Sequence, residues 1–132
     1  MFVTTERRQK PQALSPGEEI RFVVPYVPPS VNHYVKHTNS GHHYVTEEGV
    51  EYKQAVRIFA GGISIRAKAY ELDVKVYFGK GQRGDGDNLW KCIGDGLKEA
   101  GVIHSDAAVK RWVMELDRDW NCPRTEIIVR SY

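Results

Sequence analysis

An alternating pattern of apolar and polar side chains covers residues 72–78 and predicts a β-strand with one buried face. A glycine-rich, basic segment follows at 79–84. A second periodicity then predicts a helix over about 87–100, ended by Gly101. The apolar residues that repeat on one face of this helix are Leu89, Ile93, Leu97 and Ala100. The centre of the fold is therefore expected to be a strand, a loop and a helix in succession.

Flanking patterns predict the remaining elements. Further strands are expected at 19–24, 43–45, 109–116 and 125–129, and a helix is expected from Thr46 or Glu47 to Ala60, with Val50, Ala55, Val56 and Phe59 buried. Helices and strands interleave while some strands are adjacent, so the predicted class is α+β, with a mixed sheet of about four to five strands and two main helices. We expect one domain over 19–132, preceded by a flexible, proline-containing tail at 1–18.

Composition restricts the function only loosely. The 132 residues hold 19 basic and 17 acidic side chains, a net charge of +2, which neither requires nor excludes a nucleic-acid partner. No apolar run approaches the roughly 20 residues of a membrane span, and no signal peptide opens the chain, so a cytoplasmic protein without a membrane partner is expected. Cys92 and Cys122 fit no metal-binding spacing and are expected to be reduced thiols.

Acidic side chains surround the predicted helix at 87–100. Asp85 and Asp87 lie two residues apart at its start, so both carboxylates can face one ion. Lys91 and Asp95 follow Asp87 at i+4 and i+8, on a stripe away from the apolar face. Asp106 comes after the helix, where a returning loop is expected to bring it alongside Asp85 and Asp87. Carboxylate oxygens suit Mg²⁺, and a lysine beside the ion can stabilise charge on a phosphate, so the pattern predicts magnesium-dependent phosphodiester cleavage.

Each of these residues also has an ordinary structural interpretation. Asp87 could cap the helix, Lys91 and Asp95 could form an exposed i,i+4 pair, and Asp106 could be a turn residue. A calcium-binding EF-hand starting at Asp85 is excluded, because its sixth and twelfth positions lack the required Gly and Glu.

Two glycines inside the predicted helix need a reason. Gly94 and Gly96 each cost roughly 1 kcal/mol relative to alanine. Another part of the molecule is therefore expected to approach the helix closely at these positions, either a sheet or a partner chain.

Several short motifs together point to a known family. They are DGDNLWK at 85–91, DGL at 95–97, AGVI at 100–103, DAAV at 106–109, PPSVNHY at 28–34, and YVT at 44–46 leading into a helix with Gly49 and Tyr52. This combination, spread over roughly residues 20–130, resembles the RusA Holliday junction resolvases. The resemblance implies a small homodimeric endonuclease that uses Mg²⁺, with Mn²⁺ as a substitute, and acts on four-way branched DNA. A bacterial or phage-encoded protein of DNA recombination and repair is expected.

The resemblance also implies roles for individual residues. Asp85, Asp87 and Asp106 match the family's catalytic, metal-binding acidic trio, and Lys91 matches its essential lysine. Asp95 matches a recurring position, where a supporting role is expected. The family often carries two adjacent acids at the third position, whereas this chain has Ser105 before Asp106.

DNA is expected to be held by basic and aromatic residues in the loops. The candidates are Asn32, His33, Tyr34, Lys36, His37, Lys80 and Arg83, together with Arg66 and Lys68. His33 and Tyr34 could stack on an unpaired base, or they could be a solvated loop residue and a core tyrosine. A two-fold dimer would place two sites on opposed strands of a junction, and paired symmetric nicks would resolve it.

Two other functions remain open from the sequence. The first is a catalytically inactive protein of the same fold that binds junctions or other DNA. The second is a metal-dependent hydrolase that acts on other branched DNA or on nucleotides.

Overall fold

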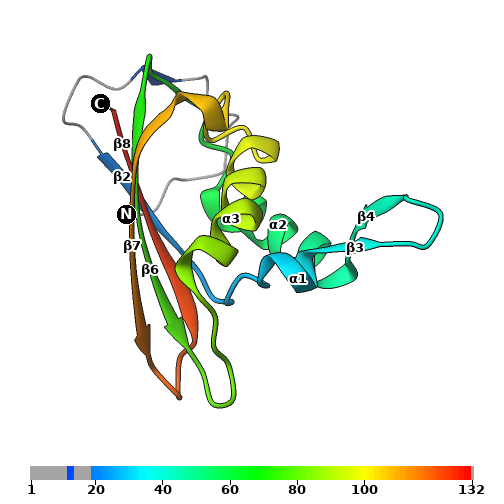
Figure 1. Cartoon of the computed structure of the whole chain (residues 1–132). Coiled ribbons are helices and arrows are strands. Elements are labelled where there is room, and N and C mark those ends of the chain that lie inside the picture. Colours follow the sequence, from blue (N-terminus) through cyan, green and yellow to red (C-terminus); the bar gives the residue numbers. More distant parts are fainter. Residues whose placement is uncertain (1–11, 14–18, 132) are drawn as a thin grey trace.

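A mixed four-stranded sheet forms one layer of the molecule, and helices cover one of its faces (Figure 1). The computed structural model describes residues 12–13 and 19–131. The strand order is β2 (Glu19–Val24), β8 (Arg124–Ser131), β6 (Tyr70–Phe78) and β7 (Val109–Arg118). β6 and β7 run parallel, whereas β8 pairs antiparallel with both β2 and β6. The predicted α+β class with a mixed sheet is confirmed.

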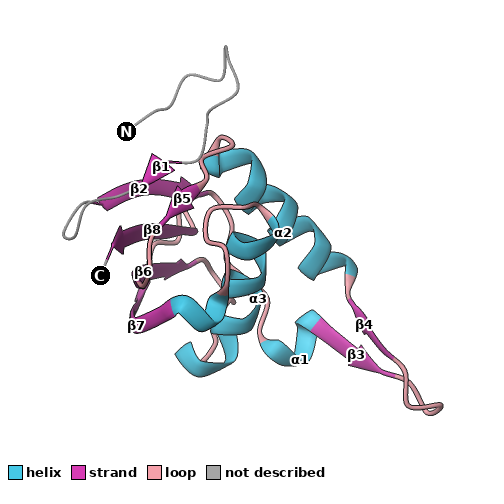
Figure 2. Cartoon of the chain, turned by 90° about the horizontal axis from the view of Figure 1, so that it is seen from above, coloured by secondary structure: helices cyan, strands magenta, loops and turns pink. Residues whose placement is uncertain are grey.

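Two long helices form the second layer, as the view from above shows (Figure 2). They are α2 (Glu47–Ala60) and α3 (Gly86–Glu99), within one residue of the bounds predicted from the sequence. Thr46 caps α2, accepting a hydrogen bond from the Gly49 amide, and Gly101 follows α3 with a φ of 78°. The start of α2 and the end of α3 therefore lie where the cap residues in the sequence predicted them.

Several short elements were missed by the sequence patterns because each is only a few residues long. They are α1 (Val31–Tyr34), β3 (Val35–His37), β5 (Ile65–Arg66), the 3₁₀ turn η1 (Asp106–Ala108) and β1 (Gln12–Ala13). β3 pairs with the expected strand β4 (His43–Val45) in a projecting hairpin. β1 falls inside the predicted tail, where it pairs in parallel with β5; the rest of that tail, 1–11 and 14–18, lies outside the described residues.

The core lies between the sheet and the two helices. Alternate side chains of β6 are buried, and Leu89, Ile93 and Leu97 of α3 pack against them, as predicted. The prediction for α2 was only half right. Ala55 and Val56 are buried, but Val50 and Phe59 are 41% and 45% exposed, because α2 turns a face centred on Tyr52 and Val56 inward.

Close packing explains the two glycines of α3. A Cβ atom added at Gly94 would lie 3.3 Å from the Trp112 ring of β7, and one at Gly96 would lie 3.2 Å from Val56 of α2. The expected close approach is therefore made by the sheet on one side and by a helix of the same chain on the other.

The open face of the sheet is covered by charged side chains that pair with one another. Its ion pairs include Arg130 with Glu19, Glu71 and Asp73, Arg111 with Glu71, Lys75 with Glu115 and Asp117, and Arg124 with Glu126. Because these cations already face carboxylates, this side of the molecule offers little net positive charge to a phosphate backbone.

Both cysteines are free thiols, as expected. Burial raises the pKa of Cys92 to about 12, so this thiol stays protonated as part of the core. No helix among the described residues is long and apolar enough to cross a membrane.

Candidate active site

Asp85 and Asp87 stand at the start of α3. Asp85 is the N-cap residue, with extended backbone, but its side chain makes no capping hydrogen bond, and Asp87 lies in the first turn. Both residues are exposed. Within the described part of the chain, no ion pair or side-chain hydrogen bond engages either carboxylate. The helix N-terminus stabilises the two ionised carboxylates, and two carboxylates this close in sequence can face one cation.

The first turn of α3 is held against β7. A Cβ atom at Gly86 would lie 3.1 Å from the Met114 sulfur, so the backbone between the two aspartates packs closely against a side chain of this strand. Asp85 and Asp87 are therefore fixed on a rigid element rather than on a free loop.

Lys91 lies one turn further along α3 and contacts Asp95. The Lys91 Nζ is 3.5 Å from the Asp95 Oδ2, and the Tyr34 hydroxyl donates a 2.6 Å hydrogen bond to the same oxygen. The Lys91 side chain is 56% exposed, whereas that of Asp95 is 25% exposed. The pair is more than an ordinary surface i,i+4 contact, because a third residue from another helix holds the acid.

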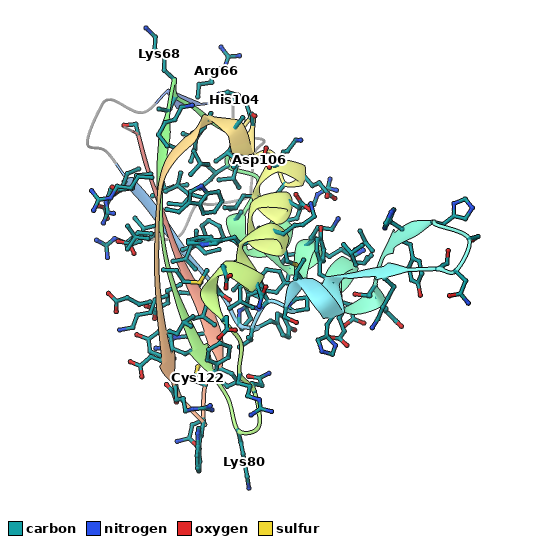
Figure 3. All side chains as sticks on the ribbon, viewed as in Figure 1. Arg66, Lys68, Lys80, His104, Asp106 and Cys122 are labelled. Carbon is teal, nitrogen blue, oxygen red and sulfur yellow. The ribbon has the colours of Figure 1, made fainter. Side chains whose placement is uncertain are left out.

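Asp106 lies at the opposite end of α3 from Asp85 and Asp87 (Figure 3). It opens η1, whose N-cap Ser105 accepts a hydrogen bond from the Ala107 amide. The 14 residues of α3 separate the two ends by about 20 Å at about 1.5 Å per residue. The expectation that the loop returns Asp106 alongside the other two aspartates is wrong within one chain, because the chain enters β7 beside the C-terminal end of α3. Among the described residues, no three acidic, His or Cys side chains gather to hold a metal ion.

Tyr34 belongs to the core. Its side chain is 1% exposed and its hydroxyl faces Asp95, so the expectation that its ring stacks on DNA is contradicted, in favour of the core tyrosine that the sequence left open. The ring lies against α2 at Gly49, where any Cβ atom would collide with it.

A groove of about 860 Å³ runs between α2 and the loop that leads to α3. His33 and Arg83, two of the predicted DNA contacts, line it together. Sequence reasoning missed three further lining residues, Tyr26, Ile58 and Phe59, which are 57%, 70% and 45% exposed. The signal for Phe59 was present as an apolar residue of α2, but helical periodicity assigned it to the core.

The family model described as Endodeoxyribonuclease RusA matches residues 25–130 of the chain. The chain belongs to the RusA family. It is accordingly an endodeoxyribonuclease, a hydrolase of DNA phosphodiester bonds, from a family of Holliday junction resolvases. The match includes both ends of α3 and the groove. A search of curated proteins found no match.

The remaining basic candidates of this RusA domain fall into separate regions. Lys36 is exposed on the β3–β4 hairpin, and Lys80 extends from the loop after β6. Arg66 and Lys68 lie at the end of the molecule that carries Asp106 (Figure 3). Nearby, His104 Nε2 lies 3.1 Å from the Ala67 carbonyl oxygen. The side chains of Asn32 and His37 lie outside the described part of the structure.

Proposed function

We propose that this RusA-family protein is a magnesium-dependent, structure-selective endonuclease that resolves four-way DNA junctions by paired symmetric nicks, in recombination and repair. The observation that carries the proposal is the start of α3, where Asp85 and Asp87 have no ion-pair partner in the described part of the chain and Lys91 lies one turn beyond. The metal is Mg²⁺, for which Mn²⁺ can substitute, because both take carboxylate oxygens in octahedral geometry.

Asp85 and Asp87 fit a hard cation, since they are exposed, held at a helix end that packs on β7, and without a competing ion pair among the described residues. An ion bound there would polarise the scissile phosphate and lower the pKa of an attacking water. Lys91 would stabilise negative charge on the phosphate or on the leaving oxygen. A cation held by these two carboxylates could accept a third. Asp106 of the same chain is too far from Asp85 and Asp87 to provide it.

A homodimer supplies that third carboxylate. A two-fold axis that crosses α3 near its middle would place Asp106 of the partner subunit beside Asp85 and Asp87, and the reverse. An apolar strip supports a contact on this side. It lies between α3 and β7, the last strand of the described sheet, and consists of Trp90, Trp112, Met114 and Leu116. Trp90 and Trp112 pack edge to face with ring centroids 4.3 Å apart, and Leu116 is 43% exposed.

The groove between α2 and the loop before α3 is the proposed path of a DNA strand towards the site. Arg83 is two residues from Asp85, so a phosphate bound by Arg83 lies next to the carboxylates. Glu48 and Glu51 line the α2 wall and repel phosphates, which keeps the backbone on the Arg83 side. Tyr26 can stack on an unpaired base. Asn32, His33, Lys36 and Lys80 are proposed as further contacts around this path.

Arg83→Ala should weaken junction binding while leaving the cleavage step nearly intact. Loss of one phosphate contact is expected to raise the Kd several-fold and to reduce the slope of log Kd against log salt by about one. Gel-shift titrations at several salt concentrations measure both quantities. The matched control is Arg111→Ala, because Arg111 lies on the open face of the sheet, paired with Glu71. Equal effects of the two substitutions would contradict the proposed path.

A competition assay tests junction selectivity. Cleavage of a labelled four-way junction in Mg²⁺ should be suppressed by unlabelled junction and barely affected by the same mass of linear duplex. Equal suppression by duplex would favour a less selective nuclease, and tight junction binding without cleavage in any divalent metal would favour a binding protein.

A further inference from the structure

We infer that Asp95, held by the buried hydroxyl of Tyr34, positions Lys91 and keeps it from pairing with Asp87. This inference rests on the proposed function, since it assigns how the lysine of that site is held. Neither Asp95 nor Tyr34 is proposed to contact DNA or metal, and both act through Lys91.

The Asp95 carboxylate is fixed from two sides. Its Oδ2 accepts a 2.6 Å hydrogen bond from Tyr34 on α1 and faces Lys91 Nζ at 3.5 Å on α3. Burial, and then the contact with Asp95, raise the pKa of Tyr34, so the hydroxyl remains a neutral donor. A hydrogen bond to an ionised carboxylate is stronger than one between neutral groups, so the Tyr34 hydroxyl orients the Asp95 side chain well.

Tyr34 is held independently of Asp95. Its carbonyl accepts a 2.8 Å hydrogen bond from the Thr46 amide, and the Thr46 hydroxyl donates to the His33 carbonyl. The ring rests against Gly49, where any Cβ atom would collide with it, and Lys53 Nζ lies 5.6 Å from its centroid. The junction of α1 with α2 therefore places the hydroxyl in advance, and Asp95 orients itself to it.

Lys91 has a carboxylate one turn away in either direction along α3. Asp87 is at i−4 and Asp95 is at i+4, and both spacings allow an ion pair. In the structure the lysine pairs with Asp95. Without this partner Lys91 would turn to Asp87, where it would neutralise a proposed metal ligand and compete with the cation. Asp95 thus does two things, since it places the Lys91 charge and leaves Asp87 open.

Asp95→Asn and Tyr34→Phe test this arrangement, because each keeps the size of the side chain. Both should lower kcat, Asp95→Asn by about tenfold or more and Tyr34→Phe by less, with little change in KM for the junction. The Mg²⁺ concentration for half-maximal rate should rise in Asp95→Asn. The control is Asp117→Asn, which alters a carboxylate 3.9 Å from Lys75 on the open face of the sheet and should leave all three values unchanged.

A spectroscopic readout separates this inference from the proposed function. In DNA-free protein, the ammonium ¹⁵N and ¹H resonances of Lys91 should shift in Asp95→Asn and in Tyr34→Phe, but not in Asp117→Asn. Unshifted Lys91 resonances in both test variants would overturn the inference even if the protein cleaves junctions. A wild-type protein that does not cleave would refute the proposed function, while the resonances would still decide where Lys91 is held. Should Asp95→Asn fail to fold, Tyr34→Phe decides alone.

Discussion

Asp87→Asn should abolish junction cleavage while the protein still folds and binds DNA. The substitution keeps the shape of an exposed side chain in the first turn of α3 but removes an anionic metal ligand. Loss of such a preorganised charge is expected to lower the rate by about 10²- to 10³-fold or more. Junction affinity should hold or rise slightly, because one negative charge near the DNA backbone is gone. Single-turnover cleavage in Mg²⁺ and gel shift in EDTA measure the two effects.

The matched control is Asp117→Asn. Asp117 is an exposed aspartate on the open face of the sheet, 3.9 Å from Lys75, and lies outside the proposed site. The Asp117→Asn variant should cleave junctions at the wild-type rate. A wild-type cleavage rate in Asp87→Asn would show that Asp87 is not a catalytic residue.

Mixed dimers should recover activity that neither parent variant has. Asp87→Asn and Asp106→Asn are each expected to be inactive as homodimers. In a heterodimer of the two, one site combines the intact Asp87 of one chain with the intact Asp106 of the other, and the second site carries both substitutions. Because one of two symmetric sites is intact, such a heterodimer should nick at about half the wild-type rate per dimer and cut one strand rather than a symmetric pair.

Co-expression of the two variants with different affinity tags, followed by tandem purification, isolates the heterodimer. A heterodimer of Asp87→Asn with wild type is the positive control. If all three carboxylates acted within one chain, both sites of the mixed dimer would be broken and no nicks would form. That outcome would require Asp106 to act at the site of its own chain, and therefore to move to the other end of α3 on DNA binding.

Local sequence patterns predicted the scaffold of the site well. The alternation in β6, the apolar stripe of α3 and the caps at Thr46 and Gly101 depend on contacts close in sequence, and the structure has all of them. The loss of helix stability expected from Gly94 and Gly96 also predicted close neighbours at these positions, and the structure identifies them as Trp112 and Val56. The spacing of Asp87 and Lys91 follows from the helix alone, because one turn separates them.

Long-range placement was not predictable in the same way. Whether Asp106 returns to the start of α3 depends on the parallel pairing of β7 with β6, which local periodicity does not show. The burial of Tyr34 depends on how the four-residue α1 docks on α2, and on the size of residue 49. Phe59 was assigned to the core because helical spacing shows that a residue shares a face, not which face turns inward.

The most direct test is cleavage by the wild-type protein of a labelled four-way junction, beside linear duplex, in Mg²⁺ and in EDTA. We predict paired, symmetrically placed nicks in the junction alone, supported by Mg²⁺ or Mn²⁺ and absent in EDTA. An intact junction in the presence of Mg²⁺ and Mn²⁺, with the protein shown to be bound to it, would contradict the proposed function.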